Sequence, residues 1–267
     1  MYRKLKDIFN SHGLKHLRLA PFDDYDFYSD KKDFLDSHNK SILTFTDLNG
    51  RLMALRPDVT LSILHHPRPG KWYYLEDVFR PDENENSLSF RKFQQAGIEF
   101  LGDFCDGDIR QVIDIALACL EKLADGKNFM LDIADTGLVA DILRKRKGKS
   151  EKHEKESEIL SCLAGRNYHG LKELDAPDEL LELLNTNSLP SKYSLSVSRH
   201  LKVDYSAVNN LNYYNGLTFK GYIETIPYCV LSGGQYDGIL RAMNSSIKNG
   251  MGFAVYLDRI GVDFDDD

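Results

Sequence analysis

Apolar residues recur at helical spacing in two segments of the first half of the chain. Residues 2–12 place Leu5, Ile8 and Phe9 on one face of a predicted helix. Residues 107–125 carry apolar side chains every three or four positions, which predicts a second, longer helix. Both patterns are amphipathic, so we expect each helix to pack one face on a core.

Short apolar runs between these helices predict strands. Residues 41–46 and 52–55 flank an Asn-Gly pair, which is a strong signal for a β-hairpin. A short helix is expected to begin near Asp58, just after the proline that ends the second of these strands. Residues 71–80 and 92–101 predict a further antiparallel pair, joined by a long polar loop.

In the second half of the chain, strands are predicted on both sides of a segment that is richer in charged residues. Residues 128–133 predict a buried strand, whereas residues from about 136 to 190 are rich in charge and carry leucine stripes, which predicts a helical insertion. Three more strands, an amphipathic helix, a glycine-bounded turn and a final helix are expected to follow. The expected ranges are 193–200, 217–223 and 228–232 for the strands, 237–243 for the amphipathic helix and 249–252 for the turn.

Antiparallel strands with helices packed on one face define an α+β fold. The chain shows no alternation of strand and helix that would indicate a parallel sheet, and no internal repeat. We therefore expect residues 1–267 to form a single domain that contains the helical insertion.

Composition and charge limit the class of protein. The 267 residues are 42% hydrophobic and 28% charged, which is enough apolar material for a sizeable core. No apolar run approaches the roughly 18 residues that span a bilayer, and the N-terminus lacks the apolar stretch of a signal peptide. We expect a soluble, cytoplasmic protein without membrane contact. The net charge of -7 is a weak argument against tRNA as a partner.

Three further patterns favour ordinary structural roles. Residues 144–158 begin basic and end acidic, which predicts a solvated loop between helices rather than a nucleic-acid patch. The four cysteines are widely spaced, which favours free buried thiols. The eight histidines show no paired ligand spacing, so we expect no metal site.

Several polar side chains in the predicted strands and turns suit a small zwitterionic ligand. Carboxylates bind an ammonium group, arginine binds a carboxylate through two parallel hydrogen bonds, and tyrosine combines a ring with a hydroxyl. The candidates of these kinds are Asp58, Glu99, Asp237, Arg80, Arg259, Gln95, Tyr213, Tyr214 and Tyr236. The same residue types occur in every protein, so their presence alone leaves a purely structural role open.

The order of six segments along the chain favours a ligand site over a purely structural role for these residues. FRPD followed by RKFQQAGIE resembles the second signature motif of class II aminoacyl-tRNA synthetases, in its histidyl form. LRPDVT, LNYYNGLTF and GGQYDG resemble the amino-acid-binding segments of histidyl-tRNA synthetases, and LRLAPFDDYDFY and GFAVYLDRI resemble the first and third motifs. The first motif builds the dimer interface in that family. The resemblance covers nearly the whole chain and implies a class II synthetase-like antiparallel sheet flanked by helices.

The resemblance also implies a histidine-binding site. By position, the amino-acid pocket would be lined by Asp58, Thr60, Gln95 and Glu99, and the imidazole would be contacted by Tyr214 and Tyr236, with Tyr213 beside them. Arg80 would sit where the family binds the α-phosphate and the carboxylate, and Arg259 where it binds the γ-phosphate of ATP.

Departures from the synthetase pattern are as informative. Asn209 stands where active enzymes carry an arginine that stabilises the adenylation transition state, and asparagine cannot supply that charge. The loop over residues 81–86 carries three carboxylates where the synthetases are basic towards ATP and tRNA. Gln235 replaces a further arginine, and only DFDDD remains near the C-terminus, so we expect no anticodon-binding domain.

This profile resembles the ATP phosphoribosyltransferase regulatory subunits, a family of synthetase paralogues without aminoacylation activity. The run from Tyr213 to Tyr222, with Lys220 in place of the usual glutamate, also resembles that family. The resemblance implies a non-catalytic subunit without cofactors, which forms a homodimer within a hetero-oligomer that contains the short catalytic phosphoribosyltransferase chain. In that family free histidine inhibits the complex, which performs the first committed step of histidine biosynthesis.

Two alternatives stay open at this point. One is an amino-acid-activating ligase that acts without tRNA, which the retained Arg80 and Arg259 favour and Asn209 opposes. The other is a pure scaffold whose pocket is vestigial. The complete set of candidate pocket residues argues against the scaffold.

Overall fold

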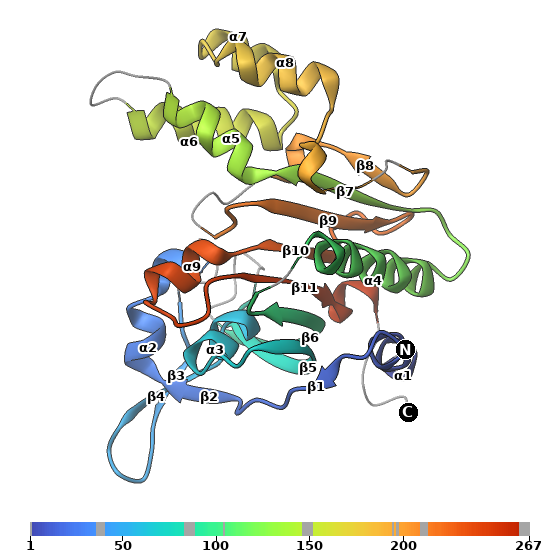
Figure 1. The fold of residues 1–267 in the computed structure, drawn as a ribbon. Coiled ribbons are helices and arrows are strands. Elements are labelled where there is room, and N and C mark those ends of the chain that lie inside the picture. The colour runs from blue at the N-terminus through green and yellow to red at the C-terminus, as the bar shows by residue number, and fades with distance from the viewer. Residues whose placement is uncertain are drawn as a thin grey trace.

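The computed structural model shows an α+β fold around one large sheet (Figure 1). It describes residues 2–35, 41–82, 89–103, 105–145, 152–193, 195, 198–208 and 213–261. Asn209, the acidic loop from 83 to 86 and the C-terminal residues 263–267 lie outside these ranges. Within them, no helix has the length and apolar character that crossing a membrane requires.

The central sheet has eight strands in the order β1-β5-β6-β11-β10-β9-β7-β8. Neighbouring strands pair antiparallel except at the two ends, where β1 runs parallel to β5 and β8 runs parallel to β7. The strands are β1 (Lys15–His16), β5 (Gly70–Pro81), β6 (Phe90–Leu101), β7 (Phe129–Asp135), β8 (Leu201–Val203), β9 (Leu217–Ile223), β10 (Leu231–Gln235) and β11 (Gly250–Tyr256). The predicted antiparallel sheet is therefore confirmed, with a parallel strand at each edge.

Helix α4 (Asp106–Ala124) packs against one face of this sheet, with α1 (Tyr2–Ser11) beside it (Figure 1). Its apolar stripe is fully buried at Cys119 and Leu120. Gly221 of β9 permits this close approach, because a Cβ atom there would lie only 2.8 Å from a methyl carbon of Leu120. Both helices predicted from apolar spacing are confirmed.

A smaller sheet of three strands, in the order β2-β4-β3, extends from the side of the large sheet (Figure 1). Its elements and the short helices that follow β2 are β2 (Phe22–Asp24), β3 (Thr44–Thr46), β4 (Leu52–Leu55), α2 (Tyr25–Ser29) and η1 (Lys32–Phe34). Between β3 and β4 the Asp47 carboxylate accepts hydrogen bonds from the backbone amides of Asn49 and Arg51, both at 2.8 Å. The predicted hairpin is confirmed.

A helical unit stands beyond β7 and β8, at the top of Figure 1. It consists of α5 (Thr136–Lys145), α6 (Lys152–Ala164), α7 (Tyr168–Glu173) and α8 (Asp178–Thr186). An ion pair of 3.3 Å between Lys145 and Glu179 joins α5 to α8, and Leu180 of α8 is fully buried. These helices lie within the predicted range of 136 to 190. Their status as an insertion in a single domain stays a prediction.

Two of the predicted elements are wrong. No strand begins at 193, because Ser191–Tyr193 form a 3-10 helix (η3) and Ser198 closes a tight turn, in which its hydroxyl accepts from the Leu201 amide at 3.2 Å. The turn expected at 249–252 is instead the start of β11. Its glycine at 252 permits close packing rather than a turn, because a Cβ there would collide with the Glu99 carboxylate.

Other differences are smaller. The strand expected at 228–232 runs from Leu231 to Gln235, and the amphipathic helix α9 (Asp237–Ala242) lies where it was expected. The final helix is a single 3-10 turn, η5 (Leu257–Ile260). Cys105 is exposed before α4, so the prediction of buried thiols is wrong at this position.

Candidate functional site

A cavity of about 230 Å³ lies on the face of the sheet opposite α4. Alternate residues of each strand point to opposite faces, and this separates Gln95, Lys220 and Ser232, which line the cavity, from neighbours such as Ala96 and Phe219, which join the core beneath α4. The predicted site residues that line this cavity are Asp58, Thr60, Arg80, Gln95, Tyr213, Tyr214, Tyr236 and Arg259. Two candidates do not line it: Glu99 lies directly behind the wall, and Asp237 Oδ1 accepts a hydrogen bond of 2.9 Å from the Gly250 amide at the start of β11.

Asp58 is held at the start of helix α3 (Val59–His65), as the sequence predicts. Its Oδ1 atom accepts a hydrogen bond of 2.8 Å from the Leu61 amide, so it caps the helix. Its Oδ2 atom lies 3.6 Å from Arg80 Nη2, and Arg80 Nε donates to the Pro57 carbonyl at 2.7 Å. This pair places one negative and one positive group side by side at the cavity wall.

Glu99 is buried, with 1% of its surface exposed. Thr60 Oγ1 donates to its carboxylate at 2.6 Å, and the Tyr236 hydroxyl donates to the other oxygen. Burial raises the pKa of Glu99 to about 8, although these two hydrogen bonds favour the ionised form. A neutral carboxyl at pH 7 becomes ionised when a cation is placed beside it, so Glu99 is suited to bind an imidazole or ammonium group.

Gln95 lines the cavity and is 3% exposed. Its amide carries both a donor and an acceptor, so it can pair with a ligand that offers either kind of group.

Three tyrosines form an aromatic wall. The ring centroids of Tyr213 and Tyr214 are 4.7 Å apart, and those of Tyr213 and Tyr236 are 6.3 Å apart. Burial raises the pKa values of Tyr213 and Tyr236 well above the ordinary value, so both hydroxyls stay protonated and act as donors. Gly234 keeps room for this wall, because a Cβ there would lie 2.7 Å from the Tyr214 ring.

The opposite end of the cavity contains residues that the sequence reasoning did not assign to the site. Lys220, Cys229, Ser232 and Tyr256 line it. The Tyr256 hydroxyl lies 2.6 Å from Ser232 Oγ, and the Arg259 guanidinium stacks 4.5 Å above the Tyr256 ring while donating to the Cys229 carbonyl at 2.8 Å. Lys220, Ser232 and Ala254 are register partners across β9, β10 and β11, a relation that only strand pairing reveals.

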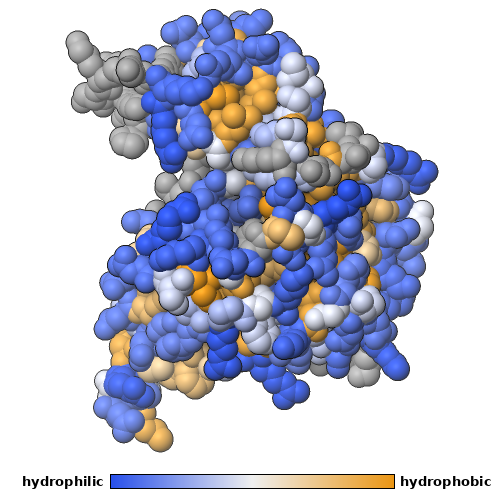
Figure 2. All heavy atoms as spheres, in the orientation of Figure 1, coloured by the Kyte–Doolittle hydropathy of each residue, from blue (hydrophilic) through white to orange (hydrophobic). Residues whose placement is uncertain are grey.

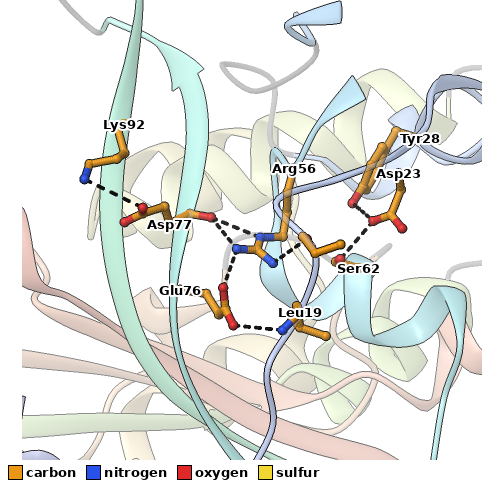
Figure 3. A network of polar contacts seen from close by, with 9 residues as sticks. Leu19, Asp23, Tyr28, Arg56, Ser62, Glu76, Asp77 and Lys92 are labelled. Carbon is orange, nitrogen blue, oxygen red and sulfur yellow. Dashed lines mark hydrogen bonds and ion pairs between the residues drawn. The ribbon is translucent and has the colours of Figure 1, made fainter. Parts of the chain in front are cut away.

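A buried network surrounds Arg56, close in the chain to Asp58 (Figure 3). Arg56 is 1% exposed, and its Nη2 atom donates to Glu76 at 2.7 Å. Its other donors bond to the carbonyls of Asp77 and Ala20. Because Arg56 stands two residues before Asp58, this network fixes where α3 begins. Sequence reasoning treated Arg56 only as a strand end.

Within the described ranges, no group of three or more histidine, cysteine, aspartate or glutamate side chains is placed to hold a metal ion. The cavity and its wall offer two carboxylates, three cations and several tyrosine hydroxyls.

Comparisons with known proteins show which family the chain resembles. A family model described as histidyl-tRNA synthetase matches residues 1–194 and 179–260. An ATP phosphoribosyltransferase regulatory subunit from Caldanaerobacter subterraneus subsp. tengcongensis is 27% identical over 296 residues, which cover 96% of this chain and 76% of that protein. A histidine–tRNA ligase from Pyrobaculum aerophilum is 29% identical over 82% of this chain and 60% of the ligase.

Solved structures show the same fold. A protein from Bacillus halodurans, described as an ATP phosphoribosyltransferase regulatory subunit/histidyl-tRNA synthetase, superposes with a TM-score of 0.70 at 19% identity, over 97% of this chain and 76% of that one. A chain of the ATP phosphoribosyl transferase complex from Thermotoga maritima superposes with a TM-score of 0.68 at 16% identity, over 96% of both chains. At these identities the likeness concerns the fold alone.

Proposed function

The chain belongs to the histidyl-tRNA synthetase family, and on that premise we propose that it is a non-catalytic regulatory subunit of ATP phosphoribosyltransferase. The observation that carries the proposal is the run of relatives with this name, which align along 96% or more of the chain. Asn209, in place of the synthetases' arginine, supports a role without adenylation.

Free histidine is the ligand proposed for the cavity. Its ammonium group would meet Asp58, Thr60 and Gln95, and its carboxylate would meet Arg80. Its imidazole would lie against Tyr214 and Tyr236, with Glu99 behind them as the proton acceptor. This arrangement gives every polar group of the amino acid a partner in the cavity, and it includes the amide of Gln95.

The proposed partner is the short catalytic chain of the phosphoribosyltransferase, in a hetero-oligomer. In this assembly the present chain would make the catalytic chain active, and histidine in the cavity would inhibit the complex. No tRNA and no cofactor take part in this proposal. The acidic net charge of -7 is consistent with a protein partner rather than a polyanion.

A homodimer is proposed within this assembly, formed through the region that resembles the first motif. Phe22 and Phe45 of the small sheet are 42% and 38% exposed, and their rings meet edge to face with centroids 5.5 Å apart. Leu48 and Leu52 of the same sheet are also exposed. Figure 2 shows apolar side chains gathered over this hairpin at the lower left. Such a patch is suited to burial against a second copy.

The deciding experiment is a turnover assay of the short phosphoribosyltransferase from the same organism. Activity is measured with and without this chain, and then with histidine added. We expect activity only in the presence of the chain, and a loss of activity with histidine. If the chain changes nothing, the proposed partner is wrong.

One alternative has a specific observation in its favour. Arg80 and Arg259 both line the cavity, so the groups that bind ATP phosphates in the synthetases are present. An amino-acid-activating ligase would catalyse exchange between ATP and pyrophosphate when histidine is supplied. The regulatory subunit would not.

A further inference from the structure

Arg166 joins the helical unit to the segment around Asp204. It lies in the turn between α6 and α7, where its φ of 53° is in the left-handed region. Its Nη2 atom lies 2.6 Å from Asp204 Oδ2, and its Nε atom lies 3.3 Å from Ser206 Oγ. Asp204 and Ser206 belong to the start of the 3-10 helix η4 (Tyr205–Ala207), which packs on α6. The Arg166 side chain, in the turn between α6 and α7, thus contacts the start of η4.

Asp204 caps η4, since its Oδ1 atom accepts a hydrogen bond of 2.9 Å from the Ser206 amide. Through its contact with Asp204, Arg166 therefore joins the turn between α6 and α7 to the start of η4.

The connection from Arg166 to the cavity runs across the sheet. Arg166 Nη2 lies 3.7 Å from Asp132 Oδ2 on β7, and Asp132 is the register partner of Lys220 on β9, which lines the cavity. The Asp132 side chain is 9% exposed, and within the described ranges its Oδ1 atom has no hydrogen-bond partner. Burial and the charge of Asp204 raise its pKa, whereas Lys202, Arg166 and Lys220 oppose that shift. Its ionised form thus depends on the cations around it.

We propose that Arg166 couples the cavity to the helical unit, as a positioning residue for Lys220. A ligand that contacts Lys220 favours the arrangement in which the α6–α7 turn contacts η4. The reverse also holds, because coupling between two sites is reciprocal. A partner that moves α6–α7 would then change ligand affinity in the cavity. The inference rests on the proposed histidine site only for one of its two readouts.

An arginine is required for this role. Its Nη2 atom contacts both Asp204 and Asp132 while its Nε atom contacts Ser206, whereas the ammonium of a lysine is a single point charge. The left-handed backbone at this turn would suit glycine better than arginine. The side-chain contacts offset the strain of the positive φ.

The test compares Arg166→Gln with Arg144→Gln in the full chain. Arg144 is a matched control, because it lies in α5 of the same helical unit but is 74% exposed and, among the described residues, is paired with Asp141 on its own helix turn. Two quantities are measured: the hydrogen exchange rate of the β9 amides from 217 to 223 without ligand, and the affinity for free histidine. We expect Arg166→Gln to speed the exchange and weaken histidine binding, each by about fivefold to a hundredfold. Arg144→Gln should match the wild type.

Each other outcome has a definite meaning. Equal exchange and equal affinity in both variants would overturn the coupling and leave the proposed function standing. If the wild type does not bind histidine, the sensing proposal fails, while faster exchange in Arg166→Gln alone still supports the coupling. An even rise in exchange across β5 and β6 as well would indicate general destabilisation and would overturn a local role.

Discussion

Two buried ionisable residues behave in opposite ways around the cavity. Arg56 has an ionised partner, Glu76, and its remaining donors bond to backbone carbonyls, so its charge is part of the structure. Glu99 has only hydroxyl groups as hydrogen-bond partners, and burial therefore raises its pKa to about 8. A buried group without a counter-charge changes its protonation instead of its position. Glu99 is thus the residue that responds to a ligand cation.

The raised pKa of Glu99 makes folding depend on pH. The folded pKa of about 8 lies above the unfolded value of 4.5, so Glu99 contributes stability that is full below about pH 4.5 and is lost as the pH rises through 8. Glu99→Gln removes this dependence. The free energy of unfolding of the variant, relative to wild type, should rise from about pH 5 to pH 8, by a few kcal/mol at most. Urea denaturation across this range measures the difference.

Glu121→Gln is the control for this series, because Glu121 is exposed on α4. Its unfolding free energy should run parallel to the wild type at every pH. A difference between wild type and Glu99→Gln that stays constant over this range would contradict the assigned protonation of Glu99.

Arg56 predicts a large loss of stability. Arg56→Met fills similar space but leaves Glu76 and three backbone carbonyl contacts without their donor. Breaking a buried ion pair on one side costs about 3–5 kcal/mol. Arg51→Met removes an ion pair in which the arginine side chain is 64% exposed, and it should cost about 1 kcal/mol or less. Denaturant titration measures the loss of unfolding free energy in both variants. Equal losses would show that the buried network of Figure 3 contributes no more stability than the exposed ion pair.

At the scale of elements, the sequence predicts correctly those helices and turns that depend on contacts between neighbouring residues. The hairpin around Asp47, the cap at Asp58 and the stripe of α4 follow from neighbouring residues, and the structure confirms them. The strand expected at 193–200 failed because a single turn at Ser198 interrupts it. Motif residues could be named one by one, but Lys220 and Ser232 join the cavity through strand register, which the sequence does not reveal.

Strand β11 provides the test at this scale. Gly252 reads as a turn residue in the sequence, but its Cα faces the Glu99 carboxylate and the Ile98 carbonyl. Gly252→Ala should destabilise the protein by about 1–3 kcal/mol, because a Cβ has no space there. Gly107→Ala, in the first turn of α4, meets nothing closer than 3.5 Å and should stabilise by up to about 1 kcal/mol. Thermal unfolding of the two variants should therefore shift in opposite directions.

At the scale of the whole molecule, the cavity draws on elements that are distant in the sequence. Asp58 follows the small sheet, Gln95 lies in β6, and Tyr213 follows the segment that carries Asp204. Figure 1 places these elements between the hairpin at one end and the helical unit at the other. A ligand in the cavity would therefore contact chain segments that lie between the hairpin and the helical unit.

The proposed homodimer gives a prediction at this scale. Phe45→Asp places a charge in the exposed apolar patch of the small sheet, and burying that charge against a second copy would be costly. Sedimentation velocity should show the variant as a monomer at concentrations where the wild type is a dimer. Tyr168→Asp alters an apolar residue that is 52% exposed on α7, far along the chain from this patch, and should leave the dimer intact.

The regulatory proposal also predicts a numerical equality. If histidine inhibits by shifting the assembly between two states, its affinity for the complex differs from its affinity for the isolated chain, by about 5–150-fold for an ordinary coupling. Linkage requires histidine to change the affinity between the subunits by the same factor. Calorimetry gives the histidine affinities of chain and complex, and sedimentation gives the subunit affinity with and without histidine. Two unequal factors would mean that histidine also binds outside the cavity, whereas two factors of one would leave the cavity without a regulatory role.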